Sequence, residues 1–116
     1  MVVDQSAPDR TGLALHALAD PTRRDILART MAEDLSVSRL ATSYRMSLTA
    51  VQKHVAVLER AGLVHKHRRG REQLVRGDPE TVRRTRRALD LLEEAWRARL
   101  DRFGDVLAEI TQEDPP

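Results

Sequence analysis

The stretch Val37-Ser-Arg-Leu-Ala-Thr-Ser-Tyr-Arg-Met-Ser-Leu-Thr-Ala-Val-Gln-Lys-His-Val-Ala-Val-Leu-Glu-Arg-Ala-Gly-Leu63 decides the fold of this chain. Its apolar side chains recur at intervals of three and four residues, which places them on one face of each of two helices: Val37, Leu40, Ala41 and Tyr44, then Leu48, Val51, Val55 and Leu58. Ser47 can accept hydrogen bonds from the first amides of the second helix, and Gly62 can adopt the left-handed conformation that ends it. The stretch therefore predicts two short helices joined by a tight turn.

The second predicted helix carries small and hydrogen-bonding side chains away from its apolar stripe. A rotation of about 100° per residue places Thr49, Lys53, Ala56 and Arg60 opposite the stripe, with Ala50 and Gln52 on its flanks. Such a helix pair is typical of a helix-turn-helix, whose second helix meets base edges in the major groove of DNA. The alternative is a helical hairpin with no role in nucleic-acid binding, because its apolar spacing is the same.

The segment after Gly62 predicts a basic β-hairpin over about residues 63–76. Two short runs of β character flank a turn centred on Gly70, and the turn carries Arg68, Arg69 and Arg71. An anionic partner would relieve the repulsion between these like charges. A hairpin directly after a recognition helix is the wing of a winged helix-turn-helix, in which arginines enter the minor groove or hold phosphates. The alternative is a solvated basic loop.

The charges are distributed unevenly along the chain. Residues 60–87 contain ten Lys or Arg against three acids, whereas residues 88–116 contain three against eight. The net charge of +2 therefore conceals a basic middle and an acidic end. Because the local field attracts a polyanion, this pattern favours a DNA-binding role for the middle segment.

Length and composition limit the remaining functions. A chain of 116 residues with 41% apolar content predicts a single domain, without the buried cleft of a lobed enzyme. Glycine loops for phosphate and patterned nucleophile sets are absent from the sequence, so we expect neither catalysis nor a cofactor. Membrane-spanning and signal segments are also absent, so we expect a cytoplasmic location. Residues 1–9 and 113–116 are predicted to be frayed ends.

Further helices are predicted on both sides of the motif. One covers Thr11 to Ala19, and another runs from Arg23 to Met31 after the cap at Asp20 and Pro21. A long helix over residues 78–112 carries an apolar seam: Leu89, Leu92, Trp96, Leu100, Phe103, Leu107 and Ile110. A helix of about 30 residues is about 45 Å long, more than a small domain covers, so a second subunit is the expected cover. The alternative is that the helix folds back on its own domain, with a kink at Gly104.

Four segments of the chain resemble the ArsR family of bacterial repressors, over roughly residues 12–110. They are Leu18-Ala-Asp-Pro-Thr-Arg-Arg-Asp-Ile-Leu27, the stretch 35–41, the stretch 47–64, and the wing sequence Arg69-Gly-Arg71. The resemblance implies a mainly α fold with a small β-hairpin, a winged helix-turn-helix that is dimeric through its first and last helices. It also implies a DNA-binding core over residues 10–77 and a homodimer that represses transcription from a palindromic double-stranded DNA operator.

The resemblance assigns two sets of site residues. The DNA-binding set is Ser47, Thr49, Ala50, Gln52, Lys53, Arg68, Arg69 and Arg71. We add His54 to it as a candidate, although a packed ring is the alternative because His54 lies only about 60° from the buried stripe. The dimer-interface set is Leu15, Leu18, Leu89, Leu92, Trp96, Leu100, Phe103 and Leu107.

The chain departs from the family at its metal sites. Many members bind metal through a Cys-Val-Cys, and Ser36 and Ser38 stand at the matching positions here. Another family site uses Asp and His pairs on the last helix, but residues 79–116 contain no histidine. His65 and His67, two residues apart on one strand face, make only a weak metal site without a nearby carboxylate. We therefore expect no metal or thiol response, and an inducer, where there is one, of unknown identity.

Overall fold

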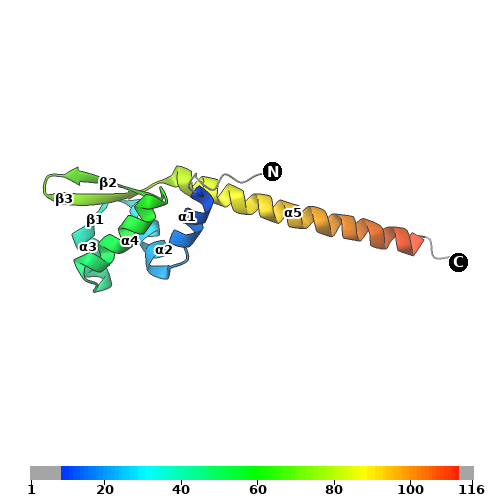
Figure 1. The fold of residues 1–116 in the computed structure, drawn as a ribbon, viewed down its shortest axis with the longest axis horizontal. Helices are drawn as coiled ribbons and strands as arrows, with labels where there is room; N and C mark the ends of the chain where they lie inside the picture. Colours follow the sequence, from blue (N-terminus) through cyan, green and yellow to red (C-terminus); the bar gives the residue numbers. More distant parts are fainter. Residues whose placement is uncertain (1–8, 113–116) are drawn as a thin grey trace. The chain divides into compact units, whose positions relative to one another are not determined.

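The computed structural model describes residues 9–112. The elements follow one another in the order α1 (Arg10–Ala17), α2 (Pro21–Ala32), β1 (Leu35–Ser36), α3 (Val37–Tyr44), α4 (Leu48–Arg60), β2 (Val64–Arg69), β3 (Glu72–Gly77) and α5 (Pro79–Gln112) (Figure 1). The predicted frayed ends, apart from residue 9, lie outside the described residues. Asp9 itself was wrongly assigned to the frayed tail, because its carboxylate accepts the amide of Gly12 at 3.0 Å and caps α1.

The helices begin where the sequence places capping side chains. Asp20 accepts the amide of Arg23 at 2.9 Å, and Ser47 accepts the amide of Ala50 at 3.1 Å. Gly62, just beyond the end of α4, has a φ of +76°, the left-handed conformation that the sequence predicts. The predicted helix pair and its tight turn are thus confirmed.

The core packs α1 to α4 against the small sheet. Its largest fully buried side chains include Ile26 of α2, Leu40 of α3, Val51 and Leu58 of α4, and Val75 of β3. The predicted apolar stripe of α4 is confirmed at three of its four positions. Leu48 is the exception: its residue is 47% exposed, because it is the first residue of α4, one turn before the buried part of the helix begins at Val51.

The sheet has one strand more than the sequence predicts. The predicted hairpin is present as β2 and β3, and β1 adds to the free edge of β3, giving an antiparallel sheet of order β1-β3-β2. Leu35 pairs with Val75, and Ser36 pairs with Leu74. Because β1 has only two residues, it shows no alternation in sequence and was missed.

The last helix belongs to two structural units. Its first turns, through Thr85, belong with the preceding elements, and the residues from Arg86 onward form a second unit. Within that second unit the helix continues through Gly104 without interruption. Among the described residues, no helix combines the length and apolar character that crossing a bilayer requires.

Candidate nucleic-acid interface

The turn between α3 and α4 depends on a strained residue. Arg45 has φ +54° and ψ +40°, a left-handed conformation that residues with a Cβ seldom adopt. It ends α3 while the amide of Met46 donates to the carbonyl of Ala41 at 3.1 Å. The exposed side chain of Arg45 thus comes just before the cap of α4. Sequence reasoning missed this residue, although the short interval between the two helices was a signal.

The N-terminal half of α4 presents the predicted polar face to solvent. Thr49, Gln52 and Lys53 are exposed, and Ala50 is half-buried. Ser47 is exposed as well, but its hydroxyl is occupied as the helix cap. The exposed Leu48, which was expected to lie in the core, joins these side chains at the start of the helix. This end of α4 therefore presents an apolar side chain, hydrogen-bonding groups and one positive charge.

His54 lies on a different side of α4, against the start of α2. Its Nδ1 is 3.4 Å from Nη1 of Arg23 and 3.9 Å from Oδ2 of Asp20. The side chain is only 20% exposed. The pKa of Asp20 is lowered, chiefly because its carboxylate accepts the backbone amide of Arg23, with the charge of His54 a further cause. These contacts favour the packed alternative for His54 over a DNA contact.

The wing is a regular hairpin with a basic tip. Its turn contains Gly70 at φ +64°, and Arg68, Arg69 and Arg71 around it are all exposed. Since side chains alternate along a strand, Arg68 shares a sheet face with Lys66, whose Nζ lies 3.3 Å from Oε1 of Glu59 on α4. The three arginines therefore differ in their surroundings.

Arg69 lies on the opposite face of the hairpin. There it lines a cavity of about 270 Å³ together with Asp34 and Glu72. Its charge is one of the causes that lower the pKa of Asp34, although the hydrogen bond from Arg76 is the largest. Arg69 is therefore placed near carboxylates of its own chain.

The two histidines of β2 lie on one strand face, as the sequence predicts, but each has a carboxylate neighbour. Nε2 of His65 is 2.8 Å from Oδ2 of Asp78, and Nε2 of His67 is 3.5 Å from Oδ2 of Asp34. The expectation that no carboxylate lies nearby was wrong, because Asp78 directly follows β3 opposite the start of β2, and Asp34 directly precedes β1, the third strand of the sheet. Even so, no three His, Asp or Glu side chains within residues 9–112 are arranged to hold a metal ion.

The predicted dimer-interface side chains are mostly exposed in the single chain. Trp96 is 54% exposed, and the other seam positions are exposed to similar degrees: Leu89, Leu92, Leu100, Phe103, Leu107 and Ile110. In α1, Leu15 is exposed, whereas Leu18 just beyond the helix packs partly against the core. The second unit thus carries an uncovered apolar surface along one helix.

A recognition helix with an exposed N-terminal half, followed directly by a basic hairpin, defines a winged helix-turn-helix protein. A sequence model of a helix-turn-helix domain family matches residues 18–67. The HTH-type transcriptional regulator Rv2034 of Mycobacterium tuberculosis is 38% identical over 84 residues, which cover 72% of this chain and 76% of that protein. An ArsR-like transcriptional regulator from Rhodococcus sp. RHA1 is 32% identical, with a TM-score of 0.76 over 84% of this chain and 92% of that one. The chain belongs to the ArsR family of transcriptional regulators.

A more distant structure shares the fold. The homodimeric winged helix-turn-helix DNA-binding domain of Mb0332 from Mycobacterium bovis is 24% identical, with a TM-score of 0.62, over 81% of this chain and 92% of that one. The first two of these proteins are transcriptional regulators, and the Mycobacterium bovis domain belongs to a possible one. The winged helix-turn-helix fold predicted from the sequence is therefore confirmed.

Proposed function

We propose that the protein is a transcriptional repressor that binds a palindromic operator as a homodimer, in the cytoplasm of a bacterial cell. The observation that carries the proposal is the exposed N-terminal half of α4 beside an arginine-tipped wing. The helix supplies groups that discriminate bases, and the wing supplies charge that attracts phosphate.

The reading residues are those at the start of α4. Gln52 carries an amide that can pair with adenine, and the Lys53 ammonium can reach guanine or the backbone. Thr49 offers a hydroxyl, and Leu48 offers an apolar group suited to the methyl of thymine. The Arg45 guanidinium, just before the helix, is assigned to phosphate. Ser47 and Ala50 complete this set, because their small side chains let the N-terminal end of α4 come close to the DNA.

The wing arginines are assigned to contacts with the phosphate backbone of the DNA. Within residues 9–112, none of Arg68, Arg69 and Arg71 forms an ion pair. Their charges are therefore available to phosphate, with release of counterions. Because Arg69 shares a cavity with Asp34 and Glu72, we assign the larger share of the phosphate contacts to Arg68 and Arg71.

The dimer is assigned to the first and last helices. An uncovered seam that includes Trp96 and Phe103 is costly in water, and a second copy would remove it from solvent. The Mycobacterium bovis domain of the same fold is homodimeric. Two copies related by a two-fold axis would present two recognition helices to the halves of a palindrome.

We further propose that the protein belongs to a branch of the family without metal or thiol sensing. The sequence contains no cysteine, so thiolate ligands and thiol oxidation are not available. Ser36, at one of the familiar ligand positions, instead accepts the amide of Arg39 at 3.1 Å and caps α3. A hydroxyl in this role is a poor ligand for a soft metal.

The experiment that tests the proposal is genome-wide recovery of bound DNA, followed by titration of the recovered site. We expect affinity for the recovered palindrome to exceed affinity for a scrambled duplex by about a thousandfold or more at physiological salt. In transcription from that promoter, added protein should lower the product. Equal affinity for both duplexes across salt concentrations would instead indicate a nonspecific architectural protein, and increased product would indicate an activator.

A further inference from the structure

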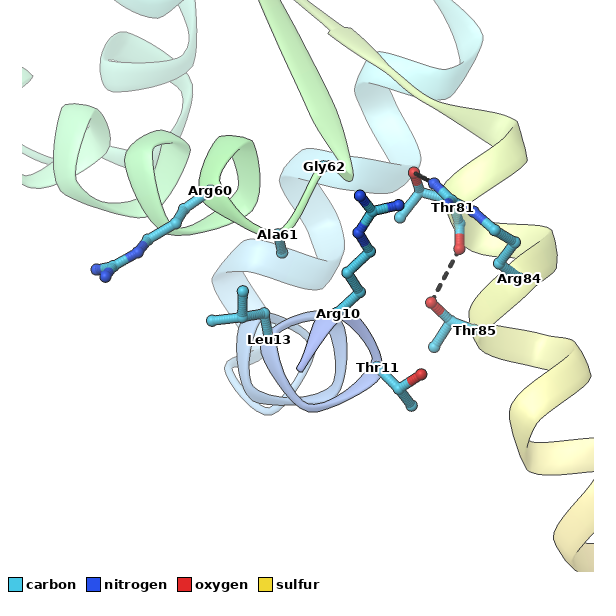
Figure 2. Close-up of a pocket in the computed structure, with 9 residues that line it drawn as sticks. All are labelled: Arg10, Thr11, Leu13, Arg60, Ala61, Gly62, Thr81, Arg84 and Thr85. Atoms are coloured by element: carbon cyan, nitrogen blue, oxygen red, sulfur yellow. Dashed lines mark hydrogen bonds between the residues drawn. The ribbon is translucent and has the colours of Figure 1, made fainter. Parts of the chain in front are cut away.

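A pocket separate from the DNA-facing surface lies within the first structural unit. Its volume is about 430 Å³, within the usual range for small-molecule sites. Residues of α1, of the end of α4 and of the first turns of α5 form its walls (Figure 2). The elements meet because Gly62 ends α4 next to Thr81 of α5.

Two arginines from different helices face the same part of this pocket. Figure 2 shows Arg10 of α1 extending toward Thr81 and Arg84 of α5, whereas Arg60 points away from them. Nη2 of Arg84 donates to Oγ1 of Thr81 at 3.0 Å. Among the residues that line the pocket, none is acidic. Two positive charges therefore share one wall without a carboxylate between them.

The nearby carboxylate of Asp78 is already occupied. It accepts the amides of Glu80 and Thr81, the Thr81 hydroxyl at 3.4 Å, and a hydrogen bond at 2.8 Å in its pair with His65. Glu80, the next acid, pairs with Arg83 at 2.9 Å. Asp9, next to Arg10 in the sequence, accepts the amide of Gly12 at 3.0 Å and lines an adjoining pocket. Within residues 9–112, neither Arg10 nor Arg84 forms an ion pair, so their positive charges are left for an external anion.

The remaining walls are suited to an apolar group. Leu13 is half-buried and Ala61 is buried, and both line the pocket. The hydroxyl of the buried Thr85 donates to the carbonyl of Thr81 at 2.9 Å, so its hydrogen is not available to a ligand. A phosphate could accept hydrogen bonds from the arginines, but its remaining oxygens would lose water against these apolar walls without gaining hydrogen bonds in return.

We propose that this pocket binds a small organic carboxylate, with the carboxyl group between Arg10 and Arg84 and the apolar body against Leu13 and Ala61. An arginine can hold a carboxylate through two parallel hydrogen bonds. Because the pocket includes the end of the recognition helix, occupancy acts on DNA binding. The effect of the bound carboxylate on DNA binding rests on the proposed function, whereas the existence of the binding site does not depend on it.

The site is tested by calorimetry on the full-length protein, with benzoate and hexanoate as probes. We expect saturable binding of at least one probe, with the matched amide, benzamide or hexanamide, and inorganic phosphate at least about tenfold weaker, because the charged hydrogen bonds and the apolar contact are both required. Arg10→Gln and Arg84→Gln should each weaken the probe at least about tenfold. Arg83→Gln is the matched control, since Arg83 is a neighbouring exposed arginine that does not line the pocket.

Several results would overturn the site: no saturable binding of either carboxylate, equal binding of the amide or of phosphate, or an unchanged affinity in both pocket variants. Circular dichroism checks that the variants fold, and the amide resonances of Thr11 and Gly62 should shift only when the probe binds. DNA titration with and without the bound probe tests the effector role. An unchanged DNA affinity refutes that role alone, while a protein that binds no operator refutes the proposed function and leaves the calorimetric result standing.

Discussion

Asp78 connects the wing to the last helix through His65: Oδ2 of Asp78 lies 2.8 Å from Nε2 of His65 on β2, and Oδ1 accepts the amide of Glu80 at 2.9 Å. The hydrogen bond with His65 is the largest cause that holds the pKa of Asp78 below its ordinary value of 3.8. A carboxyl group whose pKa is lowered in the folded state stabilises the fold at pH values above its ordinary pKa. That contribution is lost as the pH falls through the lowered pKa.

Replacement of Asp78 by Asn should therefore reduce stability at pH 7 and have less effect in acid. Asn keeps the capping ability, so the loss at pH 7 is expected to be below about 1 kcal/mol, as for other exposed ion pairs. Asp78→Ala should lose about 1 kcal/mol more, because the cap is removed too. Urea unfolding at pH 7 and at about pH 2 measures both, because the contribution is lost only as the pH falls through the lowered pKa of Asp78, which lies below 3.8. A stability difference between wild type and Asp78→Asn that is the same at the two pH values would contradict the argument.

Gln52→Ala should weaken operator binding by about 1 to 3 kcal/mol and random-DNA binding much less, because a base contact acts only on the correct sequence. Leu48→Ala should show the same selectivity with a smaller loss, since it removes an apolar contact. Gln112→Ala, an exposed glutamine at the end of α5, serves as the control. Fluorescence anisotropy on both duplexes provides the measurement. Equal losses on operator and random DNA would reassign Gln52 to backbone contact.

The wing arginines should behave in the opposite way. Arg68→Ala or Arg71→Ala should lower affinity for operator and random DNA alike, and should reduce the salt slope by about one unit. Arg69→Ala should have a smaller effect, because Asp34 and Glu72 already share its surroundings. Arg68→Lys is the matched control and should retain most of the slope. A change in base preference in the wing variants would show that the wing reads sequence.

The sequence predicted those elements whose signals are local. Two kinds of signal act within a few residues: the helix caps at Asp20 and Ser47, and the glycines that follow α4 and form the wing turn. The helix ends and the hairpin turn could therefore be predicted from the sequence. The contacts that were missed depend on topology: β1 pairs with residues about 40 positions later, and Asp34 and Asp78 reach the β2 histidines from outside the hairpin. Apolar periodicity also misplaced Leu48, because periodicity defines a face but not where along the helix the core ends.

Metals and oxidants should leave DNA binding unchanged. The sequence contains no cysteine, so thiol oxidants have no thiol to oxidise and soft metals have no thiolate ligand. Ser36 is engaged as a helix cap, and within residues 9–112 no three His, Asp or Glu side chains are arranged to hold a metal ion such as zinc, nickel or cadmium. Operator titrations with each reagent measure this, and a cysteine-dependent family member is the positive control. Stoichiometric metal uptake that abolishes DNA binding would refute the prediction. His65→Gln and His67→Gln would then show whether the β2 pair is responsible.

The α5 seam should determine the oligomeric state. Trp96→Glu or Leu100→Glu places a charge in the proposed interface, where it would be buried without a partner, so each variant should be monomeric or aggregated. Leu91→Glu is the matched control, because Leu91 is an exposed leucine of the same helix outside the seam. Size-exclusion chromatography with light scattering gives the mass. The two seam variants should also bind the operator more weakly, since a dimer holds two half-sites together. A wild-type chain that is monomeric at micromolar concentration would refute the dimer, as would a Leu91→Glu variant that dissociates while Trp96→Glu does not.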